Sequence, residues 1–338
     1  MKKLSIKDIA QKAGVSTATV SFVLNGKAEE MRISDTLAKK ITKLAKTLGY
    51  QPNQLARGLR TGKTHTLGLI VENISNHFFG NLAKVIEDEA KKCNYKVLYC
   101  STENNTAKAK ELIQMLQDRQ VDGYIITPTE GLEGDIEKLL QAGKPVVLVD
   151  RYYTSLKTNY VLVDNYRSVY DTVAKMAESG LRNIGVVTID LAMINMEQRM
   201  DGYKDALKAA KIPFRKELVR IIPFDTPREK AMEEVGNFLQ GDQEMDAVFF
   251  LTNYLGIVGL ECLKKLKIRV PEKMAFVSFD DHDIFRLHTP SITALAQPVE
   301  EIGKTAMQIL LEEMKNGAVK NEAHHLLPGE LIVRESAL

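Results

Sequence analysis

The sequence predicts a small all-α head followed by an α/β body of two doubly wound parallel-sheet subdomains. Three observations lead to this fold class. Residues 1–50 show helical hydrophobic periodicity only, with glycine and serine between the segments. From residue 66 onward, short apolar runs of strand length alternate with helical segments of ~10–15 residues. A chain of 338 residues also exceeds the ~150 residues typical of one domain.

The head is predicted to contain three short helices. The first, in "SIKDIAQKA", begins after Ser5 as its N-cap and ends at the next glycine. The second follows after a tight turn, begins after Ser16 and runs to about Asn25, so the pair forms a helix-turn-helix. The third, in "SDTLAKKITKLAKTLGY", keeps leucine and isoleucine in helical register and stops at its final glycine.

The body alternates strands and helices in the order expected of parallel sheets covered on both faces. Nine strands over about 215 residues are too many for one such sheet, so we expect two. The strand candidates are residues 66–72, 95–101, 123–128, 145–150, 160–164, 183–189, 218–222, 246–252 and 274–280. The helical stretches between most of them are residues 79–93, 106–119, 165–178, 199–210, 227–240 and 255–266. A last strand is expected in the tail "HHLLPGELIVRESAL".

Charge is distributed unevenly along the chain. Residues 1–62 contain nine Lys and three Arg against two Asp and two Glu, a net +8, so the rest of the chain carries −6 within the total of +2. A basic head on a mildly acidic body indicates that the head meets a polyanion. Three cysteines without C-x-x-C spacing argue against disulfides and zinc. No apolar run resembles a signal peptide or reaches the ~18 residues of a membrane helix, so we expect a cytoplasmic protein.

The second helix of the head is unusual because it carries no charged residue from Val15 to Asn25. At 100° per residue, Val20 and Val23 share its inner face, whereas Phe22 points the other way. An exposed phenylalanine on a small helix is costly unless something covers it. A thymine C5-methyl group in the DNA major groove would cover it. The alternative is that the third helix or the body covers this ring.

Four segments together resemble the lactose-repressor (LacI/GalR) family of transcriptional regulators across essentially the whole chain. They are "IKDIAQKAGVSTATVSFVLNGK", "LGYQPNQLARGLRTGKTHTLGLIVENISNHFF", "VPEKMAFVSFDD" and "TPSITALAQPVEEIG". The resemblance implies a DNA-binding headpiece at 1–50, a hinge helix at 51–63, and an effector-binding and dimerisation domain at 64–338 with a fold like that of periplasmic binding proteins. Its N-subdomain is expected at about 64–161 plus 292–322, and its C-subdomain at about 162–291 plus 323–338.

The resemblance also implies how the head reads DNA. Thr17, Ala18 and Phe22 match the main base-reading positions of the recognition helix. Phe22 stands where the family often has arginine, so we do not expect the usual guanine-containing half-site. In "PNQLARGL" the hinge helix is expected to insert Leu59 through the minor groove. The residues expected to contact DNA are Ser16, Thr17, Ala18, Ser21, Phe22, Asn25, Ala56, Arg57 and Leu59.

Polar and aromatic side chains stand where the body strands end, which is where parallel sheets bind ligands. Their carboxylates, guanidinium groups and amides suit sugar hydroxyls, and their aromatic faces suit sugar C–H surfaces. The set resembles, position by position, the pocket of periplasmic pentose-binding proteins. The residues expected to bind the effector are Asn76, Phe78, Phe79, Asp150, Arg151, Arg199, Asn253, Asp280 and Gln297. For each single residue, the alternative is a helix cap or a structural pair such as Asp150 with Arg151.

Three further positions in the body concern ligand or metal binding. His77 stands where the family usually has proline, and Tyr254 offers a further stacking or hydroxyl contact to an effector. The pair at residues 324–325 is expected to be solvated surface, because no third metal ligand stands at a suitable spacing. We therefore expect neither a metal nor a cofactor.

Taken together, these features predict a homodimeric transcriptional repressor that binds a roughly palindromic operator under the control of a monosaccharide or sugar acid. The absence of a C-terminal heptad segment favours a dimer over a tetramer. One alternative is a nucleobase or a phosphorylated sugar as the effector. Another class of alternative is an enzyme acting on a sugar, or a solute-binding protein without regulatory DNA binding. No carboxylate pair is evident as acid and base, and the basic head argues against the solute-binding protein.

Overall fold

The structure is a computed structural model that describes residues 4–50, 63–241, 244–317 and 322–338. It divides into two compact units, Met1–Thr64 and His65–Leu338, which are called the head and the body and are considered separately. Among the described residues, no helix combines the length and the hydropathy needed to cross a bilayer.

Three helices build the head, as predicted: α1 (Ile6–Ala13), α2 (Thr17–Leu24) and α3 (Asp35–Thr47). A capping box starts α1, because the Ser5 side chain accepts from the Asp8 amide while the Asp8 carboxylate accepts from the Ser5 amide at 2.8 Å. The left-handed Gly14, at φ 73°, ends the helix. The core of the head contains the fully buried residues Ile9, Val20 and Ile41.

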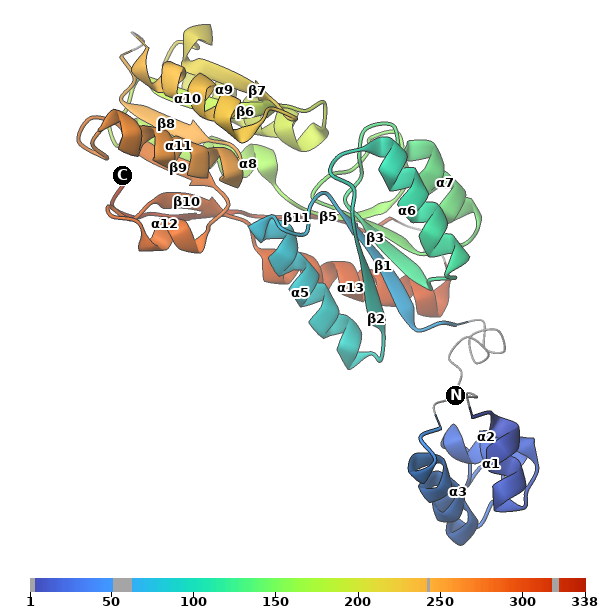
Figure 1. Cartoon of the computed structure of the whole chain (residues 1–338). Helices are drawn as coiled ribbons and strands as arrows, with labels where there is room; N and C mark the ends of the chain where they lie inside the picture. The colour runs from blue at the N-terminus through green and yellow to red at the C-terminus, as the bar shows by residue number, and fades with distance from the viewer. Residues whose placement is uncertain (1–3, 51–62, 242–243, 318–321) are drawn as a thin grey trace. The chain divides into compact units, whose positions relative to one another are not determined.

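The body contains two six-stranded sheets (Figure 1). The first has the order β11-β5-β4-β3-β1-β2 and is parallel throughout. Its strands are β1 (Thr66–Val71), β2 (Lys96–Ser101), β3 (Gly123–Ile126), β4 (Val146–Val149), β5 (Asn159–Val163) and β11 (His324–Leu327). The second has the order β12-β10-β9-β8-β6-β7, in which only the β10–β12 pair is antiparallel. Its strands are β6 (Ile184–Asp190), β7 (Val219–Pro223), β8 (Ala247–Phe250), β9 (Ala275–Phe279), β10 (Thr293–Ala296) and β12 (Glu330–Ile332).

Helices cover both faces of each sheet, which confirms the doubly wound architecture. On the first sheet, α5 (His77–Lys92) and α13 (Val299–Asn316) pack on one face, and α6 (Thr106–Asp118) and α7 (Glu133–Gln141) pack on the other (Figure 1). On the second sheet, α8 (Asn165–Glu178) and α9 (Ile194–Ala209) lie opposite α10 (Arg228–Gln240) and α11 (Asn253–Leu266). The short α12 (Asp283–Leu287) follows β9, and a 3-10 turn at Lys216–Leu218 precedes β7. Each sheet with its helices is called a lobe.

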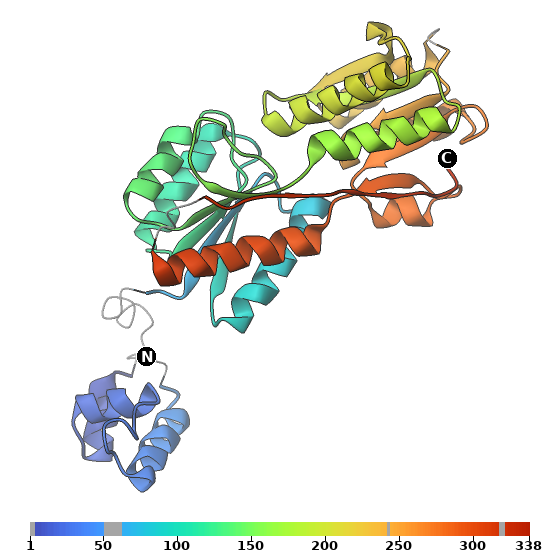
Figure 2. The same cartoon turned by 180° about the vertical axis from the view of Figure 1, so that it is seen from behind.

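Three connections join the lobes: from β5 to α8, from β10 to α13, and from β11 to β12. Figure 2 shows the C-terminal one running as a long segment from one lobe into the other. The last two connections come later in the chain than the expected subdomain borders at 292 and 323. Strand β10 still pairs with β9 of the second sheet, and β11 pairs with β5 of the first. Both strands are only four residues long, and the local sequence does not specify the sheet to which such a strand adds.

Candidate functional site

In the head, α2 presents the face that was expected to read DNA. Thr17 and Ala18 are exposed and Phe22 is half-buried, whereas Val20 and Val23 are buried against α1 and α3. The helical faces therefore lie as the 100° periodicity predicts. Phe22 is not part of the buried cluster that forms the core of the head. Packing within that core therefore does not explain why a phenylalanine stands at this position.

Three other predicted DNA contacts have structural partners within α2. The Ser16 side chain caps the helix by accepting from the Thr19 amide at 3.1 Å. The Asn25 amide group donates to the Ser21 carbonyl at 2.6 Å, and lies 3.3 Å from the Ser21 hydroxyl. These bonds fix both ends of the helix. The remaining predicted contacts, Ala56, Arg57 and Leu59, lie outside the described residues.

In the body, all nine residues expected to bind the effector line one small hollow between the lobes. This hollow of about 40 Å³ is called the inner chamber. The first lobe contributes Asn76, Phe78, Phe79, Asp150 and Arg151, the second contributes Arg199, Asn253 and Asp280, and Gln297 lies on the connection from β10 to α13. The carboxyl ends of the strands in both sheets therefore meet at one place, as the order of elements predicts.

Two aspartates occupy equivalent places in the two lobes. Asp150 follows β4 and Asp280 follows β9, each directly after the last strand residue. Both adopt left-handed backbone conformations, with φ 66° for Asp150 and 62° for Asp280. Aspartate and asparagine tolerate this conformation better than other residues with a Cβ atom, which explains why the turn uses this residue type.

The Asp280 carboxylate is held by two amide groups. Gln297 donates to one oxygen at 2.7 Å, and Asn253 donates to the other at 3.1 Å. Burial raises the pKa of Asp280 to about 6, although the Arg199 guanidinium and the Gln297 hydrogen bond oppose this shift. At neutral pH the Asp280 carboxylate is therefore ionised, although burial makes its charge energetically unfavourable. Such a carboxylate favours a ligand that donates hydrogen bonds to it.

A direct bridge joins the lobes at the edge of this chamber. Asn76 and Asn253 exchange amide hydrogen bonds, at 3.0 Å and 3.3 Å, between the loop after β1 and the start of α11. Asn76 also caps α5 by accepting from the Phe78 amide at 3.0 Å. A ligand that reaches these amides therefore competes with a contact between the lobes.

Arg199 is positioned by its own lobe. It lies inside α9, which begins at Ile194 and hence five residues before the start expected from the sequence. Its guanidinium donates to Asn165 at 2.8 Å and to the Leu251 carbonyl at 2.6 Å, and lies 3.5 Å from the centroid of the Phe279 ring. Burial lowers the pKa of Arg199 to about 10, which leaves it charged at neutral pH.

Arg151 is the centre of a buried ionic cluster that sequence reasoning anticipated only in part. It pairs with Asp150, at 3.1 Å from its Nε, as the structural alternative proposed. It also pairs with Glu72 and donates to Asn104, neither of which was predicted. Burial raises the pKa of Glu72, and the charge of Arg151 opposes the shift. Glu72 directly follows β1, so its place at a strand end was the signal available in the sequence.

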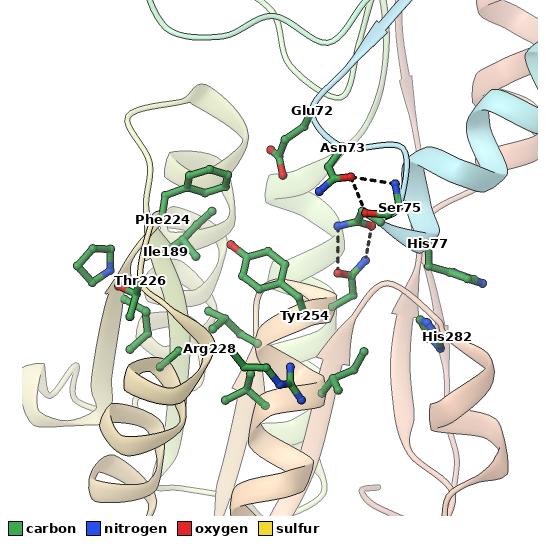
Figure 3. A pocket seen from close by; sticks show the side chains of 18 residues that line it. Glu72, Asn73, Ser75, His77, Ile189, Phe224, Thr226, Arg228, Tyr254 and His282 are labelled. Carbon is green, nitrogen blue, oxygen red and sulfur yellow. Dashed lines mark hydrogen bonds between the residues drawn. The ribbon is translucent and has the colours of Figure 1, made fainter. Parts of the chain in front are cut away.

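A second, larger hollow opens beside the inner chamber and is called the outer chamber (Figure 3). Its volume is about 420 Å³, and five residues line both chambers: Glu72, Asn76, Ile189, Asn253 and Tyr254. Its other walls come from the loop after β1, from β7 and the start of α10, and from α11. Sequence reasoning named Tyr254 as a possible contact but missed the rest of this space.

Two histidines meet across the lobes at one side of the outer chamber (Figure 3). The rings of His77 and His282 lie 4.3 Å apart, centroid to centroid. Burial and the neighbouring His77 lower the pKa of His282. The pair at residues 324–325 is exposed, as expected. Within the described ranges, no group of three metal-ligating side chains occurs.

Comparisons with known proteins agree with this architecture. Residues 5–53 match the family model "Bacterial regulatory proteins, lacI family", and residues 173–337 match "Periplasmic binding protein-like domain". Catabolite control protein A from Priestia megaterium is 30% identical over 98% of this chain and 99% of its own length. A LacI-family regulator from Enterococcus faecium with bound ribose is 26% identical over 80% of this chain and 98% of that one, with a TM-score of 0.71.

The fold of the entire chain also has a solved counterpart. The lac repressor dimer bound to operator and the anti-inducer ONPF covers 100% of both chains with a TM-score of 0.87, at 20% identity. A solved protein thus combines a head and a body of this fold in one chain. The chain belongs to the lacI family of bacterial regulatory proteins and is a DNA-binding transcriptional regulator.

Proposed function

We propose that this regulator binds a roughly palindromic operator as a homodimer and that a small sugar between the lobes controls its operator affinity. The effector class is a monosaccharide or a sugar acid, and the action is repression in the cytoplasm, without catalytic turnover. One observation carries the proposal: nine polar and aromatic side chains from both lobes and their connection line a single chamber.

The polar groups of the inner chamber suit hydroxyl groups. The Asp280 carboxylate accepts hydrogen bonds, while the Arg199 guanidinium and the Asn253 amide donate them. One buried oxygen, Gln297 Oε1, has no hydrogen-bond partner in the described part of the chain. A sugar hydroxyl donating to this oxygen would supply the missing bond, and such a bond is what buried polar atoms normally have.

Effector binding would act through the relative orientation of the lobes. The Asn76–Asn253 bridge spans them, so a ligand that replaces this bridge alters the free-energy difference between lobe arrangements. In a dimer, that change would alter the separation of the two hinge segments and hence the affinity for a two-fold operator.

The charge balance of the chamber argues against a phosphorylated effector. Arg151 is already neutralised by Glu72 and Asp150. Arg199 faces the Asp280 charge, which raises its pKa against the effect of burial. A phosphate would therefore enter a chamber without a spare cation, whereas a neutral sugar needs none.

The test is operator binding measured with and without sugars. Operator sequences selected from random DNA would be titrated by fluorescence anisotropy in the presence of pentoses, hexoses and their acids. We expect at least one sugar to change the Kd for the operator. Asn253→Ala should abolish that sugar-dependent change, and because it also removes the bridge to Asn76, it should itself shift the Kd for the operator. Asn237→Ala, an exposed position on α10, should respond normally. The proposal fails if no sugar alters operator binding, or if Asn253→Ala responds like the wild type.

A further inference from the structure

Two histidines face each other across the lobes, each at the start of a helix (Figure 3). His77 is the first residue of α5 in the first lobe, and His282 is the N-cap of α12 in the second lobe. Their ring centroids lie 4.3 Å apart, with the ring planes tilted by 38°. Any change in the separation of the lobes on this side therefore changes the distance between two titratable rings.

The hydrogen bonds of both rings suit the neutral form of histidine. His282 Nδ1 accepts from the Ile284 amide at 3.1 Å and so caps α12. The side-chain nitrogen of Asn81, which can only donate, lies 3.2 Å from His77 Nε2. Imidazolium has no acceptor nitrogen, so protonation of either ring removes one of these bonds. His77 also stands in the first turn of the 16-residue α5, where the helix dipole disfavours positive charge.

Three carboxylates lie near the pair, and each already has partners. They are Asp280, which accepts from Gln297 and Asn253, Asp281, which pairs with Arg334 at 2.7 Å, and Asp283, which pairs with Arg286 at 3.2 Å. Two further charged groups of the outer chamber, Glu72 and Arg228, pair with Arg151 and Glu261. Burial and the neighbouring His77 lower the pKa of His282, although Asp283 and Asp281 oppose this shift.

We propose that the His77–His282 pair couples the separation of the two lobes to pH. Neutral rings pack against each other and hold the lobes in the arrangement described here, whereas two imidazolium rings repel each other and favour separated lobes. The pKa of His282 is lowered only while the rings are together, so separated lobes bind the proton more readily. The shift toward separation therefore begins as pH falls below about 6.5, the ordinary pKa of histidine.

The coupling of pH to lobe separation requires no sugar. Its effect on operator affinity rests on the proposed function, in which the orientation of the lobes controls DNA binding. A proton would then be a second signal that acts on the same movement as the effector.

The experiment measures the distance between the lobes in the full-length protein. Spin labels would be placed on Cys93, which is exposed after α5, and on Lys265→Cys, an exposed position on α11. Dilution with unlabelled protein leaves pairs of labels within one chain, and EDTA in the buffers excludes a metal ion between the rings. Electron–electron double resonance would give the distances at pH 8 and at about pH 5.5. We expect the ratio of the short to the long distance population to fall about tenfold, the change produced by a difference of one unit in a single pKa.

Three variants assign this response to the histidine pair. His77→Gln combined with His282→Asn cannot be protonated, and the asparagine still accepts from the Ile284 amide, so the distance should not depend on pH. His77→Lys combined with His282→Lys carries two positive charges and should show the long distance at pH 8 as well. His325→Gln, an exposed position on β11 outside both chambers, should respond like the wild type.

Asp280 titrates in the same range, because burial raises its pKa to about 6, and the three variants leave it in place. A pH response that persists in the glutamine–asparagine variant would therefore belong to Asp280 and would overturn the proposal. Equal distances at both pH values in the wild type would also overturn it.

Operator titrations by fluorescence anisotropy without sugar, at the same two pH values and constant salt, separate this proposal from the proposed function. Residues 1–62 contain no histidine, so a histidine effect on the operator Kd has to come from the body. We expect the Kd of the wild type to change with pH more than that of the glutamine–asparagine variant. If the lobes separate in acid but the two proteins show the same pH dependence of Kd, the histidine switch stands and control of DNA binding by lobe orientation is wrong.

Discussion

Replacing Asp280 with asparagine should make the protein more stable at neutral pH while weakening effector binding. Asparagine keeps the shape of the side chain and tolerates the left-handed backbone at this position, where φ is 62°. Alanine would add backbone strain, so it is the poorer test. The substitution removes the charge, which burial penalises, and the anionic acceptor, which a sugar hydroxyl would use. It also replaces one acceptor oxygen with an amide donor, which Gln297 can satisfy by turning its Oε1 toward it, since that oxygen has no partner among the described residues.

The expected magnitude follows from the pKa of Asp280, which burial raises from 3.8 to about 6. At pH 7, ionising this carboxyl in the folded protein costs at most about 3 kcal/mol, at 1.36 kcal/mol per pKa unit. The side chain keeps some contact with solvent, so we expect a gain of about 1–2 kcal/mol for Asp280→Asn. For a domain of this size, that gain raises Tm by roughly 2–4 °C.

The sign of the pH dependence gives a sharper criterion. Between pH 3.8 and 6 the folded protein holds more protons at this site than the unfolded chain, so this group makes the free energy of unfolding fall as pH rises. The asparagine variant lacks this contribution. Its advantage over the wild type should therefore be largest at pH 7 and vanish near pH 4.

Thermal unfolding of the two proteins from pH 4 to pH 8 would measure this difference. Asp201→Asn, an exposed position on α9, is the matched control and should leave Tm within experimental error at every pH. The reasoning is refuted if Asp280→Asn is less stable than the wild type at pH 7, or if its advantage does not depend on pH.

Three further predictions concern the head and the hinge. Phe22→Arg should shift the half-site selected from random DNA toward guanine, and an unchanged consensus would contradict base reading by Phe22. Leu59→Ala should weaken operator binding in anisotropy titrations far more than binding to non-specific DNA, and equal losses would exclude an intercalating role. Ser5→Ala removes the side chain that accepts from the Asp8 amide, so opening of α1 should become easier by about 1 kcal/mol. Amide hydrogen exchange in the intact chain would measure that change, and unaltered protection of α1 would show that the cap contributes nothing.

Local sequence predicted the elements of the body well because of how they are buried. All nine strand candidates correspond to β1–β9, since strands covered on both faces are continuous apolar runs bounded by turns. The later strands, each of three or four residues, were predicted less well: β10 and β11 were assigned to the wrong lobe, and one strand was expected in the tail that contains both β11 and β12. Their positions depend on pairing with β9, β5 and β10, and such long-range pairing leaves no pattern in so short a segment.

The sequence predicted those residues of the inner chamber that stand at or near the ends of strands. All nine expected residues line the inner chamber, because parallel strands bring their carboxyl ends to one edge. The sequence does not reveal that Glu72 pairs with Arg151, 79 positions away, or that Asn76 bonds Asn253 in the other lobe. The outer chamber could not be predicted from the sequence for the same reason, since it exists only where two separately folded surfaces face each other.

The late strands β11 and β12 have a consequence for how the chain is made. Each sheet receives an edge strand from residues 324–332, and Ser336, which is fully buried, bonds back to Phe276 and Thr293. Residues 324–332 must therefore be synthesised before either sheet is complete. The head, in contrast, buries its core with contacts inside its first fifty residues. During synthesis, a folded DNA-binding head precedes the completed effector lobes, and a chain truncated at residue 317 would expose a sheet edge in both lobes at once.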